Sequence, residues 1–206
     1  MARPKSARLN KEMVVDAAIE LIGGGGLEAF SMPKVAAALH VSAPSLYHYF
    51  ADRDALLAAV AKAVATPEPP GALPPDADWT DYLVAQAVAL RRRIVAHPHC
   101  APLLARFMPR EHMFDEYEHI CRFLTDAGVP AHLHVRIVDG VTALTIGAAI
   151  LNENAADYAD SGPGPSPGVG YPALRAALAA AEGLSGDEMF ESYVRTYLAG
   201  IVRATE

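Results

Sequence analysis

The chain has 206 residues, of which 52% are hydrophobic and 20% are charged, proportions that suit a globular protein and exclude an intrinsically disordered one. No apolar stretch follows the basic N-terminus, so we expect no signal peptide, and the longest nearly apolar run, Val135–Leu151, carries charges and is too short to span a membrane. Cys100 and Cys121 both lie in apolar helical patterns, which favours a reduced, cytoplasmic protein without disulfides.

Charge is distributed unevenly along the chain, whose net charge is −7. Residues 1–65 hold seven Lys and Arg against six Asp and Glu, a net charge of +1, whereas residues 66–206 hold ten against eighteen, a net charge of −8. Arg3, Lys5, Arg8 and Lys11 crowd the first positions. This asymmetry favours a head that faces a polyanion and an acidic body behind it.

The first half of the head, residues 1–65, is predicted to form two helices. Asn10 can cap the first, and the glycine run Gly23–Gly26 should end it. Ser31 can cap the second, with Pro33 in the first turn, where a missing N–H costs nothing. The apolar residues that we expect to face the core are Val14, Ala17, Ala18, Leu21, Ile22, Met32, Val35, Ala36 and Leu39.

A third helix should begin at Ser42, with Pro44 in its first turn, and a fourth after Asp52, whose carboxylate suits the positive end of a helix. The core face of the fourth helix should hold Leu56, Leu57, Val60 and Val64. The stretch Thr66–Asp78 contains five prolines and must be a connection, which divides the chain into domains 1–65 and 66–206.

Longer helices follow the connection, and a Gly- and Pro-rich loop, Ser161–Pro172, separates them from a last helix that a Ser185–Glu188 capping box opens. No segment alternates with period two for long enough to be a strand. We therefore predict an all-α protein with an N-terminal three-helix, helix-turn-helix head and a larger helical-bundle body. The expected body helices are Trp79–Ala96, Ala101–Met108, Arg110–Ala127 and Ala131–Ala155.

The helices on either side of His40, Val41 and Ser42 have the size of a helix-turn-helix. In the second of them, spacing predicts that Leu46, Tyr49 and Phe50 pack inward. Small residues at the tip allow close approach to base edges, while hydroxyls and an imidazole can reach phosphates, which the N–H groups of a helix N-terminus also attract. The outward residues should be Ala43, Pro44, Ser45, Tyr47 and His48.

From Val14 to Val64 the chain resembles the DNA-binding region of the tetracycline-repressor (TetR) family of bacterial transcriptional regulators. The matching stretches are AAIELI, LEAFSMPKVAAALHVSAPSLYHYF and ADRDALLAAV, in order and without a gap. The remaining helices are similar to the effector-binding and dimerisation body of that family. The resemblance implies a regulator that needs no cofactor.

The resemblance also implies roles for individual residues. The position of Ser31 binds a phosphate, and that of Arg53 anchors a phosphate from the fourth helix. The positions of His48 and Tyr49 touch phosphate or pack beneath. The positions that face the bases or nearby backbone are those of Ala43, Pro44, Ser45 and Tyr47. Two departures stand out: His40 replaces a common glycine in the turn, at some conformational cost, and Pro33 replaces an arginine that reads a base in some members. The expected DNA-binding set is Ser31, Lys34, Ser42, Ala43, Pro44, Ser45, Tyr47, His48, Tyr49 and Arg53.

Two further expectations concern the body. An apolar or aromatic effector should bind between its helices, and the candidate residues are Phe107, Met108, Met113, Phe114, Tyr117 and Thr145. Small residues on one face of Val138–Leu151, with the apolar stripe Phe190–Ile201, predict a four-helix interface in a homodimer. The hypothesis is then a repressor that binds a palindromic double-stranded operator as a dimer and leaves it when the effector binds.

Other interpretations stay open. A pair of helices of this size can be a structural hairpin. His112, Glu116 and His119 share one helix face at i, i+4 and i+7, so a metal-responsive regulator is an alternative, although no CxxC or HExxH motif supports it. The body histidines and cysteine that could join them are His97, His99, Cys100, His132 and His134. No residue set is spaced for catalysis, which argues against an enzyme, and a regulator without any ligand is a further possibility.

Overall fold

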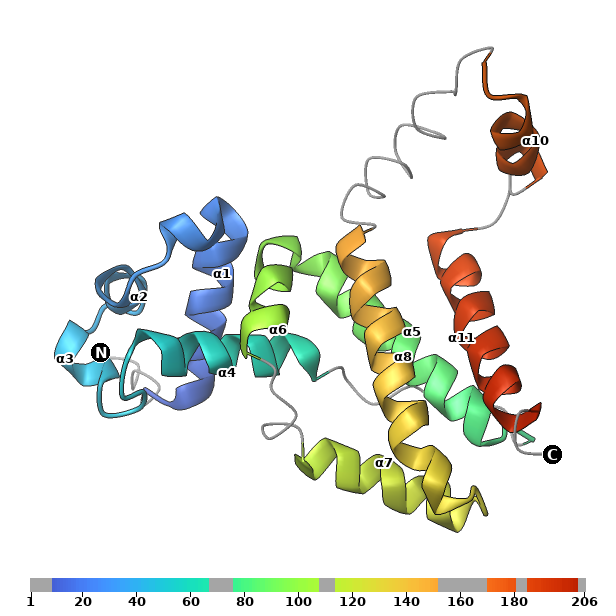
Figure 1. The fold of residues 1–206 in the computed structure, drawn as a ribbon. Helices are drawn as coiled ribbons and strands as arrows, with labels where there is room; N and C mark the ends of the chain where they lie inside the picture. Colours follow the sequence, from blue (N-terminus) through green and yellow to red (C-terminus); the bar gives the residue numbers. More distant parts are fainter. Residues whose placement is uncertain (1–8, 67–75, 108–113, 152–169, 181–184, 204–206) are drawn as a thin grey trace, which may run out of the picture. The chain divides into compact units, whose positions relative to one another are not determined.

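The structure is a computed structural model that describes residues 9–66, 76–107, 114–151, 170–180 and 185–203. Within these ranges every regular element is a helix, which confirms the all-α class (Figure 1). The helices are α1 (Lys11–Ala29), α2 (Met32–Ala38), α3 (Ala43–Leu46), α4 (Arg53–Ala65), α5 (Trp79–Ala96), the 3-10 helix η1 (Pro98–Cys100), α6 (Ala101–Phe107), α7 (Phe114–Asp126), α8 (Ala131–Leu151), α10 (Pro172–Ala180) and α11 (Gly186–Arg203).

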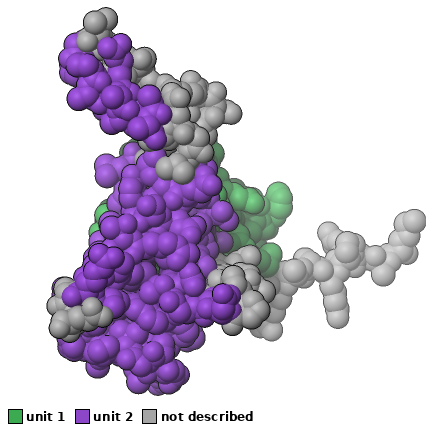
Figure 2. Space-filling model, turned by 90° about the vertical axis from the view of Figure 1, so that its right-hand side faces the viewer, with its two compact units in different colours: residues 1–66, 96–113 green, residues 67–95, 114–206 purple. Residues whose placement is uncertain are grey.

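The chain forms two compact units, coloured separately in Figure 2. Unit 1 comprises residues 1–66 and 96–113, and unit 2 comprises residues 67–95 and 114–206. Unit 1 therefore contains η1 and α6 in addition to the four N-terminal helices, because α6 packs on α4 and η1 packs on α1. The functional division at residues 65 and 66 stays a prediction.

Unit 1 begins each of three helices with a side-chain cap, as the sequence predicts. Asn10 Oδ1 accepts a hydrogen bond from the Met13 amide at 2.8 Å, and Asp52 Oδ1 accepts one from the Ala55 amide at 2.7 Å. Ser31 Oγ accepts a longer one from an amide of α2. The apolar faces meet in a core whose largest fully buried side chains include Val14, Ile22, Leu46, Leu56, Leu57, Leu103 and Leu104. Of the predicted core residues in this unit, Leu21 and Leu39 are half-buried.

The glycine run interrupts α1 at its third and fourth glycines. Gly25 has φ −155°, and Gly26 has φ +67°, in the left-handed region that favours glycine. A short helical stretch then continues to Ala29, and the Phe30 amide donates to the Leu27 carbonyl at 3.2 Å. The predicted break of the first helix at the glycines is confirmed, and one more helical turn after this kink leads to α2.

Unit 2 has its own core, formed by α5, α7, α8 and α11, and its buried members are Leu83, Val84, Ala87, Leu124, Val129, Leu133, Ile137, Phe190, Val194, Leu198 and Ile201. The predicted capping box opens α11, because the Ser185 amide donates to Glu188 Oε2 at 2.7 Å and the Glu188 amide donates to Ser185 Oγ at 3.2 Å. The helix α10 was not expected from the sequence. Residues 110–113 and 152–155, which were assigned to helices, lie outside the described residues.

Ion pairs between distant parts of the chain tie α5 to α11. Asp187, in the first turn of α11, accepts from Arg91 Nη1 and from Arg92 Nε at 2.6 Å each. Arg91 is buried, and its guanidinium Cζ lies 5.7 Å from the centroid of the Phe190 ring. Removing Asp187 would therefore leave a buried cation without its carboxylate.

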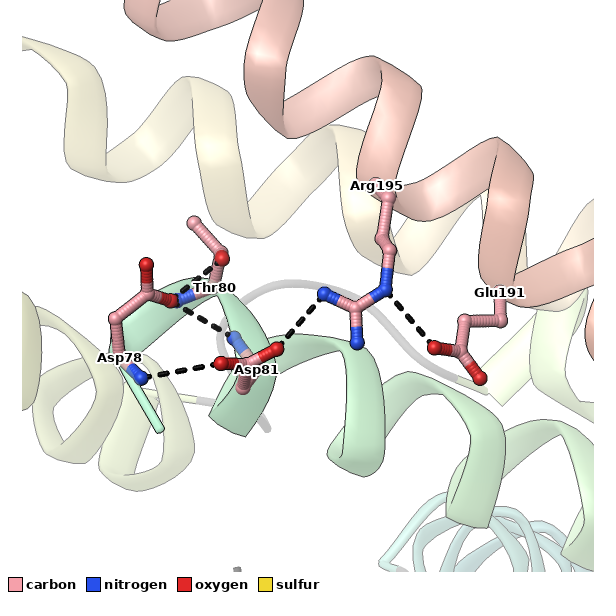
Figure 3. A network of polar contacts seen from close by, with 5 residues as sticks. All are labelled: Asp78, Thr80, Asp81, Glu191 and Arg195. Carbon is pink, nitrogen blue, oxygen red and sulfur yellow. Dashed lines mark hydrogen bonds and ion pairs between the residues drawn. The ribbon is translucent and has the colours of Figure 1, made fainter. Parts of the chain in front are cut away.

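A second tie between these helices lies at the start of α5 (Figure 3). Arg195 of α11 donates to Asp81 Oδ1 at 2.8 Å and to Glu191 Oε1 at 2.9 Å. Asp78 caps α5, since its Oδ1 accepts from the amide and the hydroxyl of Thr80, and these bonds lower the pKa of Asp78, the hydroxyl bond most of all. The network joins the first turn of α5 to the middle of α11.

The helices α8 and α11 approach closely at a glycine. The Tyr197 hydroxyl donates to the Arg136 carbonyl at 2.6 Å, and a Cβ at Gly140 would overlap the Tyr197 ring. By length and composition the whole 21-residue helix α8 could also cross a membrane. The expectation that the apolar run Val135–Leu151 is too short is therefore wrong once the run is extended to the complete helix. One such helix is weak evidence for a membrane protein, because a core helix passes the same test, and one face of α8 packs in the core of unit 2.

Candidate nucleic-acid interface

The turn between α2 and α3 ends α2 through two backbone hydrogen bonds. The His40 amide donates to the Ala37 carbonyl at 3.1 Å, and the Val41 amide donates to the Ala36 carbonyl at 2.9 Å. This pair of bonds is the Schellman motif, which requires a left-handed residue, and His40 has φ +56°. The left-handed conformation expected for His40 is confirmed.

The helix α3 is short, and turns continue its direction to Phe50. The Tyr47 amide donates to the Pro44 carbonyl at 3.2 Å, and the Phe50 amide donates to the Leu46 carbonyl at 3.0 Å. Ser42 Oγ and Ser45 Oγ lie 2.7 Å apart, so these two hydroxyls are hydrogen-bonded to each other across the N-terminus of the helix. They place two hydroxyl groups beside the amides of the first turn.

Burial separates the two faces of this segment as predicted. Leu46 is completely buried and Phe50 is 7% exposed, whereas the Tyr47 side chain beside them is 53% exposed. Pro44 and His48 are exposed as well. Ala43 and Ser45 are half-buried, and because both side chains are small, a binding partner can come close to the backbone here. The segment Ala43–Tyr49 contains no acidic residue, so this surface carries nothing that would repel a phosphate.

Tyr49 has a structural contact in addition to its predicted role. Its hydroxyl donates to the Leu9 carbonyl at 2.6 Å, and the side chain is half-buried. The bond joins the end of the helix-turn-helix to the residue before the Asn10 cap. The sequence gives no signal for this bond, because the two partners are 40 positions apart.

The remaining candidates come from α2 and α4. Ser31 is half-buried and caps α2, while Lys34 is exposed in its first turn. The Arg53 side chain is 44% exposed, and its Cζ lies 5.3 Å from the centroid of the Phe30 ring, which fixes the guanidinium at the start of α4. Hydroxyls, an imidazole and two cations are groups that bind phosphate and sugar oxygens of DNA.

The candidate effector residues are distributed over both units. Phe107 lies in unit 1, half-buried, with the Arg106 guanidinium 4.7 Å from its ring centroid, and Phe114 is 58% exposed at the start of α7. Tyr117 and Thr145 lie on α7 and α8, which pack together, and Thr145 is buried with its hydroxyl donating to the Val141 carbonyl at 2.7 Å. The other two candidates, Met108 and Met113, lie outside the described residues.

Asp139 is a polar residue of this region that sequence reasoning did not single out as a candidate. Its Oδ1 accepts a hydrogen bond from the Tyr117 hydroxyl at 2.6 Å, and its charge also acts on Tyr197, whose pKa is raised mainly by burial. An acid in the apolar α8 was the available signal.

The histidines do not form a metal centre in the part of the chain that the structure describes, where no group of three His, Cys, Asp or Glu residues could hold an ion. His134 is buried, and its Nε2 lies 2.8 Å from the Val129 carbonyl, an arrangement in which this nitrogen donates its proton. Burial raises the pKa of Cys100 to about 11, so its thiol stays protonated at neutral pH. His112 lies outside the described residues.

Comparison with known families matches both halves of the chain. Residues 14–60 match the model of bacterial regulatory proteins of the tetR family, and residues 70–204 match the tetracyclin repressor-like C-terminal domain. The chain belongs to the TetR family. It is therefore a transcriptional regulator of the ligand-responsive, DNA-binding kind that this family comprises, and its relatives are not enzymes.

Individual relatives extend over most of the chain. The tetracycline repressor protein class D of Escherichia coli is 29% identical over 93% of this chain and 90% of its own length, and the class C protein is 31% identical over 75% and 70%. Among solved structures, a TetR from Streptomyces coelicolor superimposes with a TM-score of 0.78 at 25% identity, covering 94% of this chain and 97% of that one. A TetR from Acinetobacter baumannii AYE gives 0.72 at 26% identity, covering 96% and 98%.

Proposed function

We propose that this TetR-family regulator is a repressor that binds a palindromic operator as a homodimer and is released by a small apolar or aromatic effector. The observation that carries the proposal is the exposed Tyr47 on an acid-free surface, directly beside the buried Leu46 in the helix-turn-helix. Two such surfaces about 34–36 Å apart would enter successive major grooves on one side of the duplex. In this proposal residues 1–65 read DNA, residues 66–206 bind effector and partner subunit, and the protein works in the cytoplasm.

Exposed apolar side chains on α8 and α11 support the homodimer. Leu151 at the end of α8 is 82% exposed, and Tyr193 on α11 is 51% exposed. Ala143 is exposed and Gly147 is half-buried. These small residues give α8 a surface that a second helix can approach closely. A dimer through Val138–Leu151 and Phe190–Ile201 would cover these residues. Sedimentation velocity at micromolar concentration should therefore give twice the chain mass of 21.8 kDa.

The effector class is proposed from the residues of the body and from the relatives. Tyr117, Phe107 and Phe114 offer aromatic surface, Thr145 offers a hydroxyl, and Met108 and Met113 would add adaptable apolar surface. The curated relatives are named for repression linked to tetracycline, a polycyclic molecule. A metal-responsive regulator is the second hypothesis, and no arrangement of ligands in the described residues favours it.

The substitution Tyr47→Ala tests the DNA-binding surface. Operator duplexes would first be selected from a random pool by the wild-type protein, and affinity would be measured by fluorescence anisotropy. Because Tyr47 is half-exposed, its removal should change the free energy of unfolding by less than about 0.5 kcal/mol. The loss of one contact of about 1–3 kcal/mol in each of two heads should weaken binding by at least about thirtyfold.

Tyr171→Ala is the matched control, because Tyr171 is 62% exposed in unit 2 and belongs to no proposed site. It should leave operator affinity unchanged. Operator affinity that survives Tyr47→Ala would show that the surface is assigned wrongly. The salt dependence should be modest, corresponding to about four to eight phosphates per dimer, since each head carries few cations.

A further inference from the structure

Three charged side chains of unit 1 form a chain that runs from the start of α4 to α6. Arg53 Nη1 lies 3.7 Å from Asp54 Oδ1, and Arg106 Nη2 lies 3.2 Å from Asp54 Oδ2. All three side chains are about half-exposed, at 44%, 54% and 58% for Arg53, Asp54 and Arg106. One carboxylate thus lies between two guanidinium groups, one beside the helix-turn-helix and one on α6.

The two contacts of this carboxylate are unequal. At 3.2 Å the Arg106 contact is a hydrogen-bonded ion pair, whereas 3.7 Å is too long for a hydrogen bond from Arg53. The Arg53 guanidinium is held instead over the Phe30 ring. Asp54 therefore accepts its hydrogen bond from Arg106, while its contact with Arg53 is a looser ion pair without a hydrogen bond. The N–H groups of Arg53 stay available to a phosphate oxygen.

We propose that Arg106 is a positioning residue for DNA binding, which keeps Asp54 from hydrogen-bonding to Arg53 and offsets the negative charge of Asp54. The inference rests on the proposed function and on the phosphate contact that the family resemblance implies for Arg53. Without Arg106, the loose ion pair of Asp54 with Arg53 would tighten into a hydrogen-bonded one, and Asp54 would compete with DNA for the same N–H groups. Its uncompensated charge would also repel the phosphate backbone.

A double-mutant cycle tests the proposal. Arg106→Gln, Asp54→Asn and the double variant would be titrated with the duplex selected by the wild-type protein, in about 50 mM salt, where exposed charges are little screened. Arg106→Gln should weaken binding by about threefold to fivefold per head, the upper part of the range measured for exposed ion pairs, and on the order of tenfold for a two-headed complex. Asp54→Asn should bind as tightly as the wild type or more tightly.

The decisive comparison is the effect of Arg106→Gln in the Asp54→Asn background, where it should fall below about twofold because no carboxylate remains to capture Arg53. Arg122→Gln is the control for loss of one positive charge, since Arg122 pairs with Glu118 on the surface of unit 2. It should leave affinity unchanged. Thermal midpoints of all variants would show that each is folded.

An equal loss in both backgrounds would overturn the proposal, because Arg106 would then act on DNA directly or on the fold. Absence of any loss in Arg106→Gln, or weaker binding by Asp54→Asn alone, would overturn it too. Failure of the proposed function is a separate result. In that case the wild-type protein would select no duplex, or Tyr47→Ala would bind as tightly as the wild type.

Discussion

The two units use polar side chains differently. In unit 1 the side-chain caps at Asn10, Ser31 and Asp52 each bond an amide three positions along the chain. In unit 2 the ion pairs of Arg91 and Arg195 join residues 96 and 114 positions apart. Local caps define where helices begin in both units, but the distant bonds of unit 1 reach less far along the chain, 52 positions from Arg106 to Asp54 and 40 from Tyr49 to Leu9. The difference separates substitutions that disturb one helix from those that disturb the whole bundle.

The largest expected loss of stability comes from a substitution in the core of unit 1 and not from one at its polar groups. Leu46→Ala removes a completely buried side chain from α3, and leaving such a cavity costs about 2–5 kcal/mol of unfolding free energy. Chemical denaturation followed by circular dichroism measures the loss. The neighbouring Tyr47→Ala is the matched control, because it should weaken DNA binding but leave the free energy of unfolding nearly unchanged. Similar destabilisation by both variants would contradict the burial pattern of this segment.

The next effect concerns unit 2. Asp187→Ala removes the carboxylate shared by Arg91 and Arg92, and because the Arg91 side chain is only 8% exposed, the change leaves a buried cation unpaired. We expect a loss of about 2–3 kcal/mol, below the range for fully buried pairs, since Asp187 itself is 30% exposed. Urea denaturation measures it.

Glu118→Ala in α7 is the control for this second prediction. It breaks an ion pair at i, i+4 whose partners are 76% and 60% exposed, and such pairs contribute about 0.5 kcal/mol or less. If Asp187→Ala costs no more than Glu118→Ala, the ties between distant segments are not what holds α5 against α11.

The same distinction explains how much the sequence could predict. Caps, the capping box at Ser185 and the turn at His40 follow from residues a few positions apart, and these expectations are confirmed. The stripe of α11 is confirmed in part, because Tyr193 is exposed and the buried members, which lie in the core of unit 2, are Phe190, Val194, Leu198 and Ile201. The alternation of buried Leu46 with exposed Tyr47 was predictable for the same reason. The tie from Tyr49 to Leu9 was not, because nothing local in the sequence specifies a partner 40 positions away.

The body was harder to predict for the same physical reason. The candidate effector residues were chosen for their chemistry alone, and the structure places Phe107 in unit 1 and exposes Phe114. The Asp139 carboxylate accepts a hydrogen bond from the Tyr117 hydroxyl only because α7 packs on α8, and no local pattern in the sequence specifies that packing. The helix α10 has no cap motif as clear as that of α11, and its described side chains are exposed, so it shows no core-facing stripe.

The smallest expected change in stability concerns a helix C-terminal motif that occurs in both units. The ends of α2 and α7 carry the same pair of backbone bonds around a left-handed residue, which is His40 with φ +56° in unit 1 and Gly128 with φ +77° in unit 2. His40→Gly should relieve a left-handed strain of about 1–2 kcal/mol, offset by about 0.5–1 kcal/mol of added chain entropy in the unfolded state. The net gain should be about 0.5 kcal/mol.

Gly128→Ala should do the opposite and cost about 1 kcal/mol, because a Cβ at this position meets no neighbour and only the backbone conformation opposes it. Thermal denaturation of both variants measures the two shifts, and opposite signs are the expected result. If His40→Gly instead destabilises the protein, the imidazole contributes contacts in the turn that outweigh the strain. Operator affinity then decides whether those contacts serve DNA binding, because removing a histidine that binds phosphate would lower the affinity as well.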